Sequence, residues 1–149
     1  MNWKTSALLV GALLLAGANY VATVEGKDKA PTDKKKLQGA WSMTKDNETM
    51  RMTIEGDNFK LEFKGKSASG TFKIDPAKTP RTMDLMITKG SDEETKKYEG
   101  KTAKAIYEFD GAKFKWLANE PGSDERPAAF PKEGERAKGL YIIFEREKK

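Results

Sequence analysis

The stretch MRMTIEGDNFKLEF, residues 50–63, decides the fold class, because apolar and polar residues alternate along it on both sides of a Gly56-Asp57 turn. A period of two sends successive side chains to opposite faces of a β-strand, so this alternation predicts strands with one buried face. The apolar positions are Met50, Met52 and Ile54 before the turn and Phe59, Leu61 and Phe63 after it. The stretch therefore predicts two antiparallel strands whose apolar faces line one core.

The same alternation continues through residues 71–74, 82–88, 103–109 and 139–146, with a strong hairpin signal at Asp110-Gly111. About eight strands joined mostly by short links predict an all-β meander. An eight-stranded antiparallel sheet removes its own edges by closing on itself, so we expect a single eight-stranded antiparallel barrel. The alternative is a two-sheet β-sandwich.

The composition limits the chemistry that the chain can perform. Its 149 residues include 28 Lys and Arg and 23 Asp and Glu, but no His and no Cys. Ser-His-Asp and Cys-His triads, His or Cys metal sites and thiol redox chemistry are therefore excluded. Asp84 and Glu108 fall on the polar faces of their strands, as solvated carboxylates do. We expect no enzymatic activity, no cofactor, no metal site and, with charges of both signs mixed, no nucleic-acid partner.

The N-terminus has the pattern of an export signal. Lys4 precedes an apolar run at residues 7–15, and Ala16-Gly17-Ala18 offers small residues for cleavage. The run is shorter than the ~20 residues that a spanning helix needs, so no stable membrane anchor is expected after processing. We therefore predict a signal peptide at residues 1–18, a flexible basic tether at 19–36 and a monomeric β-barrel domain at 37–149, exported to the periplasm or the extracellular space. The stretch from Asp33 to Gln38 is compatible with one short helical turn that has Asp33 as its N-cap.

Gly39-x-Trp41 at the first strand and Arg146 at the end of the last strand resemble the lipocalin/calycin superfamily. This resemblance implies a lipocalin-like meander barrel in which Trp41 packs at the closed end beneath a basic side chain. Carried over to this chain, it pairs Trp41 with Arg146 through a cation–π contact worth about 0.5–2 kcal/mol.

A second resemblance covers nearly the whole mature chain. The chain is similar to a family of small exported domains, of unassigned function, that is abundant in planctomycete bacteria. The matching segments, in order, are LQGAW (37–41), GTFKIDP (70–76), PRTMDL (80–85), IYEFDG (106–111) and ERPAAF (125–130). The chain has Ala105 where the family pattern has Gly. The family supplies no activity, so this resemblance supports the architecture alone.

The apolar face of the predicted barrel is either a filled core or the lining of a cavity. Eight strands enclose a space that side chains can fill or that can hold one small ligand. The candidate lining residues are Met50, Met52, Phe59, Leu61, Phe63, Met83, Leu85, Tyr107, Phe114 and Trp116.

The long connection at residues 119–138 is the other candidate functional element, because connections beyond about 12–15 residues are usually functional or disordered. We expect it to fold over one rim of the barrel, with Phe130 in the opening and Arg126 held by an acidic side chain. Phe130 would then be the lid of a ligand site or the last plug of a filled core.

Two functions follow from these patterns. The first is a non-enzymatic exported β-barrel that binds a small apolar ligand inside the barrel. The alternative is an envelope interaction domain that recognises protein or polysaccharide through its outer face or the 119–138 loop.

Overall fold

The computed structural model describes residues 32–148. The predicted signal peptide at 1–18 and residues 19–31 of the predicted tether lie outside the described residues. Within residues 32–148, no helix has the length and apolar character needed to cross a membrane.

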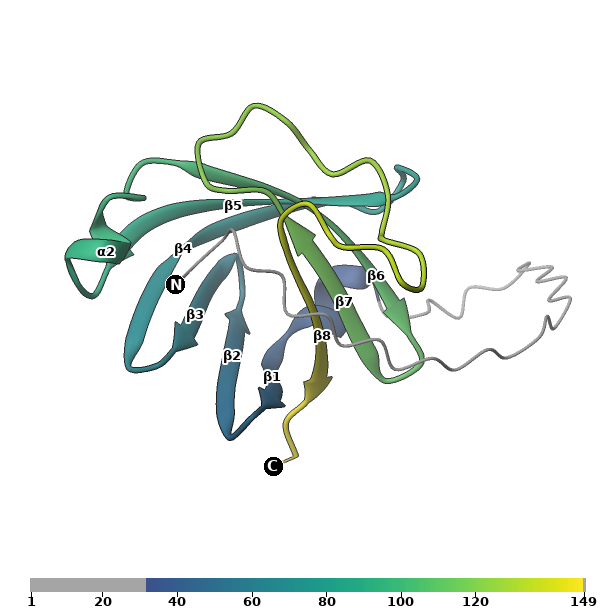
Figure 1. Cartoon of the computed structure of the whole chain (residues 1–149), viewed down its shortest axis with the longest axis horizontal. Coiled ribbons are helices and arrows are strands. Elements are labelled where there is room, and N and C mark those ends of the chain that lie inside the picture. Colours follow the sequence, from purple (N-terminus) through teal and green to yellow (C-terminus); the bar gives the residue numbers. More distant parts are fainter. Residues whose placement is uncertain (1–31, 149) are drawn as a thin grey trace, which may run out of the picture.

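Eight antiparallel strands form one closed barrel in which each strand pairs with the next and β8 pairs with β1 (Figure 1). The single eight-stranded barrel is therefore confirmed, and the two-sheet sandwich is wrong. The strands are β1 (Gly39–Lys45), β2 (Glu48–Glu55), β3 (Asn58–Phe63), β4 (Lys66–Asp75), β5 (Arg81–Gly90), β6 (Thr102–Asp110), β7 (Lys113–Ala118) and β8 (Leu140–Arg146).

Two short helices flank the barrel: α1 (Asp33–Leu37) before β1, and α2 (Glu93–Lys96) between β5 and β6. Thr32 caps the N-terminus of α1 by accepting a hydrogen bond from the Lys35 backbone. The short helical turn expected over residues 33–38 is thus present, with Thr32 and not Asp33 as its N-cap, so residues 33–36 of the predicted tether are helical. In α2, Asp92 and Thr95 form a reciprocal capping box, which stabilises the first turn of this four-residue helix.

The two ends of the barrel differ. Because the strands alternate in direction, α1 shares one end with the β2–β3, β4–β5 and β6–β7 connections; we call it the α1 end. The Gln38 side chain fixes α1 there by bonding to both the amide and the carbonyl of Gly56, at 2.7 and 3.1 Å. The opposite end carries α2, the other hairpin turns and both ends of the long connection before β8; we call it the α2 end.

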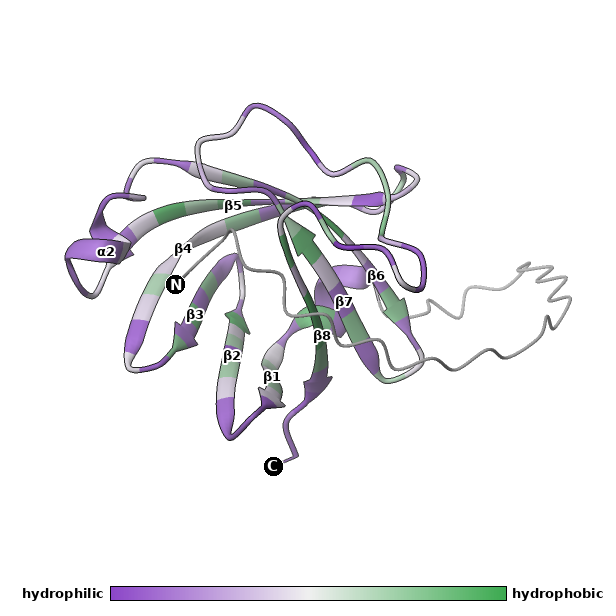
Figure 2. Cartoon of the chain, in the orientation of Figure 1, coloured by the Kyte–Doolittle hydropathy of each residue, from purple (hydrophilic) through white to green (hydrophobic). Residues whose placement is uncertain are grey.

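The inner face of the barrel is apolar and the outer face is largely polar, as Figure 2 shows by the alternating bands along the strands. Strand β2 follows the predicted parity, with Met50, Met52 and Ile54 buried and Arg51 exposed. Gly70 allows β4 and β5 to approach closely, because a Cβ there would lie 1.8 Å from the Met86 carbonyl oxygen, beside a bulge in the β4–β5 ladder.

The ladder between β1 and β8 is the shortest in the described barrel. It pairs Trp41 with Arg146 and Ser42 with Glu145, and the Glu147 amide adds a 2.9 Å hydrogen bond to the Ala40 carbonyl. The β7–β8 ladder, by comparison, runs from Lys113 to Ala118 without interruption. The barrel is therefore closed by a few bonds at the α1 end.

Candidate functional site

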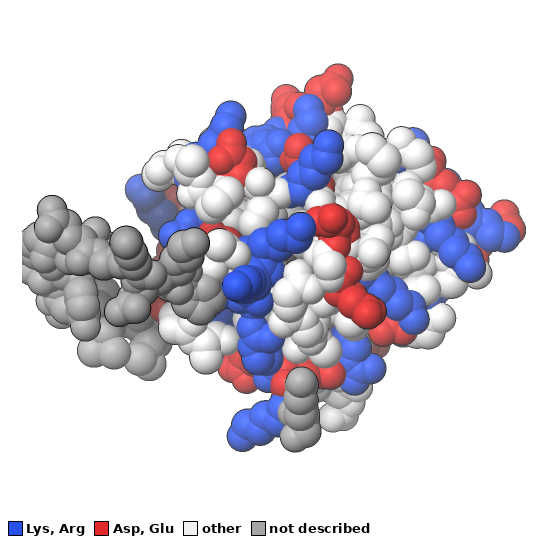
Figure 3. Space-filling model, turned by 180° about the vertical axis from the view of Figure 1, so that it is seen from behind, with Lys and Arg blue, Asp and Glu red and all other residues white. Residues whose placement is uncertain are grey.

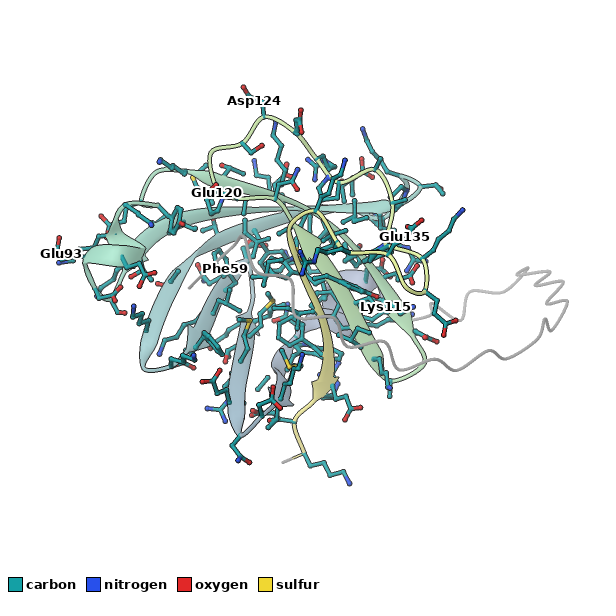
Figure 4. The ribbon with its side chains drawn as sticks, viewed as in Figure 1. Phe59, Glu93, Lys115, Glu120, Asp124 and Glu135 are labelled. Atoms are coloured by element: carbon teal, nitrogen blue, oxygen red, sulfur yellow. The ribbon has the colours of Figure 1, made fainter. Side chains whose placement is uncertain are left out.

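The barrel interior was the first candidate site, and its predicted lining residues pack against one another. Nine of the ten are only 0–4 % exposed, and Phe63 is partly buried against them. Aromatic rings fill the middle, with the Phe114 ring stacked on Phe144 at 5.8 Å between centroids. Exposed fractions this low are those of a close-packed interior. The lining residues therefore form a filled core, with Phe59 pointing into it from β3 (Figure 4).

Trp41 and Arg146 lie together at the α1 end of the barrel. The Arg146 guanidinium carbon is 4.2 Å from the centroid of the Trp41 ring. The Trp41 indole nitrogen donates to the Leu37 carbonyl at 2.8 Å, and the ring is 2 % exposed. Arg146 also donates to the Gln38 carbonyl at 2.6 Å and to the Lys36 carbonyl. Arg146 thus clamps the C-terminal end of α1 over the indole, a structural arrangement with no free reactive group.

Tyr107, predicted as a lining residue, uses its hydroxyl to hold α1. It donates to the Asp33 carboxylate at 2.8 Å, and Arg81 approaches the same carboxylate at 3.6 Å. Burial raises the pKa of Tyr107, and the hydrogen bond to Asp33 adds to the shift. The sequence signal for such a partner was the hydroxyl itself, because a buried Tyr O–H usually finds an acceptor.

Residues 119–139 connect β7 to β8 without helix or strand, and we call them the flap. Arg126 attaches the flap to the outer face of β5 and β6. Its guanidinium contacts the Asp84 carboxylate at 2.5 Å and donates to the Ala105 carbonyl at 2.8 Å. Arg126 is therefore held by an acidic side chain, and that side chain projects from the outer face of the barrel.

Phe130 lies on the outer face of the barrel, not in its opening. Its ring packs on Tyr141 at 5.7 Å between centroids, and Tyr141 alternates with the inward-facing Leu140 and Ile142. The prediction that Phe130 is a lid or plug in the barrel opening is therefore wrong. The flap follows the outer surface, so Phe130 meets Tyr141, a side chain that points outward from β8.

A second apolar cluster lies beneath the flap. Ile106 and Leu117 have outward parity in β6 and β7, pair directly in the ladder, and are 0 % and 2 % exposed. Leu117 pairs on its other side with Tyr141, which carries the Phe130 ring. We call Ile106, Leu117, Phe130 and Tyr141 the outer cluster. Burying apolar groups on the outer face is what stabilises the flap against the barrel.

Charged side chains border the outer cluster. Lys115 on β7 bridges Glu108 at 3.1 Å and Asp110 at 3.6 Å. Burial acts to lower the pKa of Lys115, but the hydrogen bond and charge of Glu108 raise it overall. Burial raises the pKa of the neighbouring Tyr141 hydroxyl. Both groups therefore stay protonated at neutral pH, and their role is to pair and to pack.

Carboxylates are spread over the surface. Among residues 32–148, no three Asp or Glu side chains are grouped as a metal site would require. Figure 3 shows basic and acidic side chains intermixed on the face opposite the view of Figure 1.

Comparison with known proteins returned no match among protein-family models, curated proteins or solved structures. The resemblance to small planctomycete exported domains stays a prediction.

Proposed function

We propose that the protein is an exported, non-enzymatic interaction domain that recognises a protein partner in the envelope through the exposed side of its flap. The observation that carries the proposal is the contrast between a packed interior and a long irregular segment fixed on the outer surface. A segment of this length with buried anchors and exposed charges is typical of a binding loop on a rigid scaffold.

The anchors of the flap leave its outer side available. Asn119 donates to the Glu125 carbonyl at 2.8 Å, and Lys104 donates to the Asp124 carbonyl at 3.0 Å, so the backbone of this turn is held. The side chains of Glu120, Asp124 and Glu125 remain exposed. Figure 4 shows Glu120, Asp124 and Glu135 at successive points along the flap.

The charge pattern favours a protein partner over a polysaccharide. The first part of the flap, residues 120–125, carries three acids and no base, while residues 132–138 carry three bases and two acids. The flap thus has an acidic stretch followed by a mixed stretch of slight positive charge, and such an uneven charge distribution gives orientation and speed to protein association. Phe130 and Tyr141, the aromatic rings of this face, are partly buried against each other. They therefore present little free ring surface for stacking on a sugar.

The experiment compares two charge reversals of equal size. Asp124→Lys changes the acidic part of the flap, and Glu55→Lys is the control at an exposed end of β2. Each protein is chemically cross-linked in an envelope fraction, and the cross-linked partners are quantified by mass spectrometry. We expect one cross-linked partner protein to disappear with the Asp124→Lys variant and to be recovered with the Glu55→Lys variant. Equal recovery in both variants, or co-sedimentation with envelope polysaccharide that Asp124→Lys weakens, would contradict a protein partner.

A small apolar ligand is the second candidate function. It is favoured by Met43 and Phe63, which face inward yet are only partly buried at the α2 end. Organic extraction of the purified protein, followed by mass spectrometry, tests this candidate. A stoichiometric lipid-like molecule would support it, and an extract without one would leave the flap as the binding element.

A further inference from the structure

Three methionines form a block on the inner face of the first hairpin. Met43 on β1 lies directly opposite Met50 on β2, and Met52, two residues further along β2, lies opposite Trp41. Met50 and Met52 are 4 % and 0 % exposed, whereas Met43 is partly buried. The other methionines of the described residues, Met83 and Met86, are both on β5.

The ladder brings the three thioethers within reach of one another. Directly opposite residues have Cβ atoms about 4.5–5.5 Å apart. Residues two apart on one strand are separated by roughly 6.6 Å, twice the rise per residue. A Met side chain is unbranched with three rotatable bonds, so sulfur atoms starting from such positions can turn toward one point.

We propose that Met43, Met50 and Met52 form a trigonal thioether site for a soft monovalent metal ion, with Cu(I) as the ion and Ag(I) as its analogue. Thioether sulfur selects Cu(I) over harder ions. The whole chain contains no His and no Cys, so its methionines are its only strong soft donors. The proposal is independent of the partner assigned to the flap.

Coordination of the ion would add little volume to the packed core. Three sulfurs at about 2.3 Å from a central ion lie roughly 4 Å from one another, which is an ordinary van der Waals separation. Coordination therefore needs the sulfurs to turn and does not need a new cavity. A monovalent ion also brings the smallest charge that must be taken out of water.

The ion has a route to the site. Met43 is the least buried of the three sulfurs and lies toward the β1–β2 turn at the α2 end, away from the end that α1 covers. Met50 and Met52 lie progressively further from that turn on the same face of β2. Met43 would thus take the ion from solvent, and Met50 and Met52 would complete the coordination inside.

The test is a titration of the full chain, labelled with ¹³C at the methionine methyl groups, with Ag(I) and with Cu(I) under reducing conditions. We expect one ion per chain by native mass spectrometry and shifts of the Met43, Met50 and Met52 methyl signals, with Met83 and Met86 unchanged. No bound ion, or shifts confined to Met1, Met83 or Met86, would overturn the proposal.

Leucine variants separate coordination from packing, because Met-to-Leu exchange conserves volume and is tolerated in cores. We expect Met43→Leu and Met50→Leu each to weaken Ag(I) binding by at least about tenfold, the lower bound for loss even of an outer-shell partner. Met83→Leu, a buried control on β5, should leave the affinity unchanged. If Met50→Leu does not fold, the partly buried Met43 carries the comparison. Wild-type affinity in Met43→Leu would refute the site.

Discussion

Replacing Phe130 by Ala tests whether the outer cluster holds the flap on the barrel. Full burial of a Phe side chain contributes about 1.5–3 kcal/mol, so a half-buried ring contributes roughly half of that. Its packing against Tyr141 adds about 0.5–1.5 kcal/mol as an aromatic pair. We therefore expect Phe130→Ala to remove about 1–3 kcal/mol from the free energy that keeps the flap closed.

Limited proteolysis under native conditions measures this loss. When opening is fast relative to cleavage, the cleavage rate follows the population of the open form. A loss of 1–3 kcal/mol should raise that rate by about 5–150-fold, with the first cuts inside residues 119–139. Phe114→Ala is the matched control, because Phe114 is fully buried in the barrel core. The Phe114→Ala variant should lower the global unfolding free energy by about 3–5 kcal/mol. Its cleavage sites should therefore be spread over the whole chain and not concentrated in the flap.

The reasoning would be refuted by either of two results. One is a Phe130→Ala cleavage rate within about twofold of the wild type. The other is a first cut outside the flap, which would mean that the barrel opens before the flap does.

Three further predictions concern the anchors of the structure. Trp41→Ala should lower the unfolding free energy by about 3–5 kcal/mol, and Arg146→Ala should lower it by less. In a double-mutant cycle measured by urea unfolding, the two substitutions should show a coupling energy of about 0.5–2 kcal/mol, and zero coupling would contradict the cation–π contact. The pKa of Tyr107 is raised in the folded state, so its contribution to the free energy of unfolding should be complete below the unfolded-state pKa of about 10. That contribution should fall as the pH rises above this value. Tyr107→Phe should therefore show a smaller alkaline loss of urea stability than the wild type, and an equal loss would contradict the assignment. Arg126→Ala and Asp84→Ala should each speed hydrogen exchange in the flap, and the double variant should add little, whereas additive effects would show that the two side chains act separately.

The barrel could be predicted from the sequence because its information is local. The alternation at residues 50–63 sets both the strand type and the face that is buried, and the structure keeps that parity. The hairpin predicted at Asp110-Gly111 likewise joins β6 to β7, although Asp110 ends β6 and the two-residue loop begins at Gly111. Neither prediction needed knowledge of a distant partner.

The flap could not be placed from the sequence because its contacts are long-range. Arg126 meets Asp84 across 42 positions, and no periodic pattern reports such a pair. A partial signal did exist at Ile106 and Leu117, which are apolar at positions where the alternation requires polar residues. Two such exceptions in adjacent strands indicate that another segment covers this part of the outer face. The flap, as the longest connection between strands, was the candidate for that segment.

The short β1–β8 ladder has a consequence for the order of assembly. Every other ladder joins two strands that are consecutive in the chain, so these hairpins can form as each strand becomes available. The β1–β8 ladder, in contrast, must bring together Ser42 and Glu145. Contacts between distant segments form late, because the entropy of closing the loop opposes them. A chain released before Arg146 would therefore stay an open sheet with two free edges, and such edges pair with other copies. The last few residues of β8 thus decide whether the sheet closes on itself or keeps two unpaired edges.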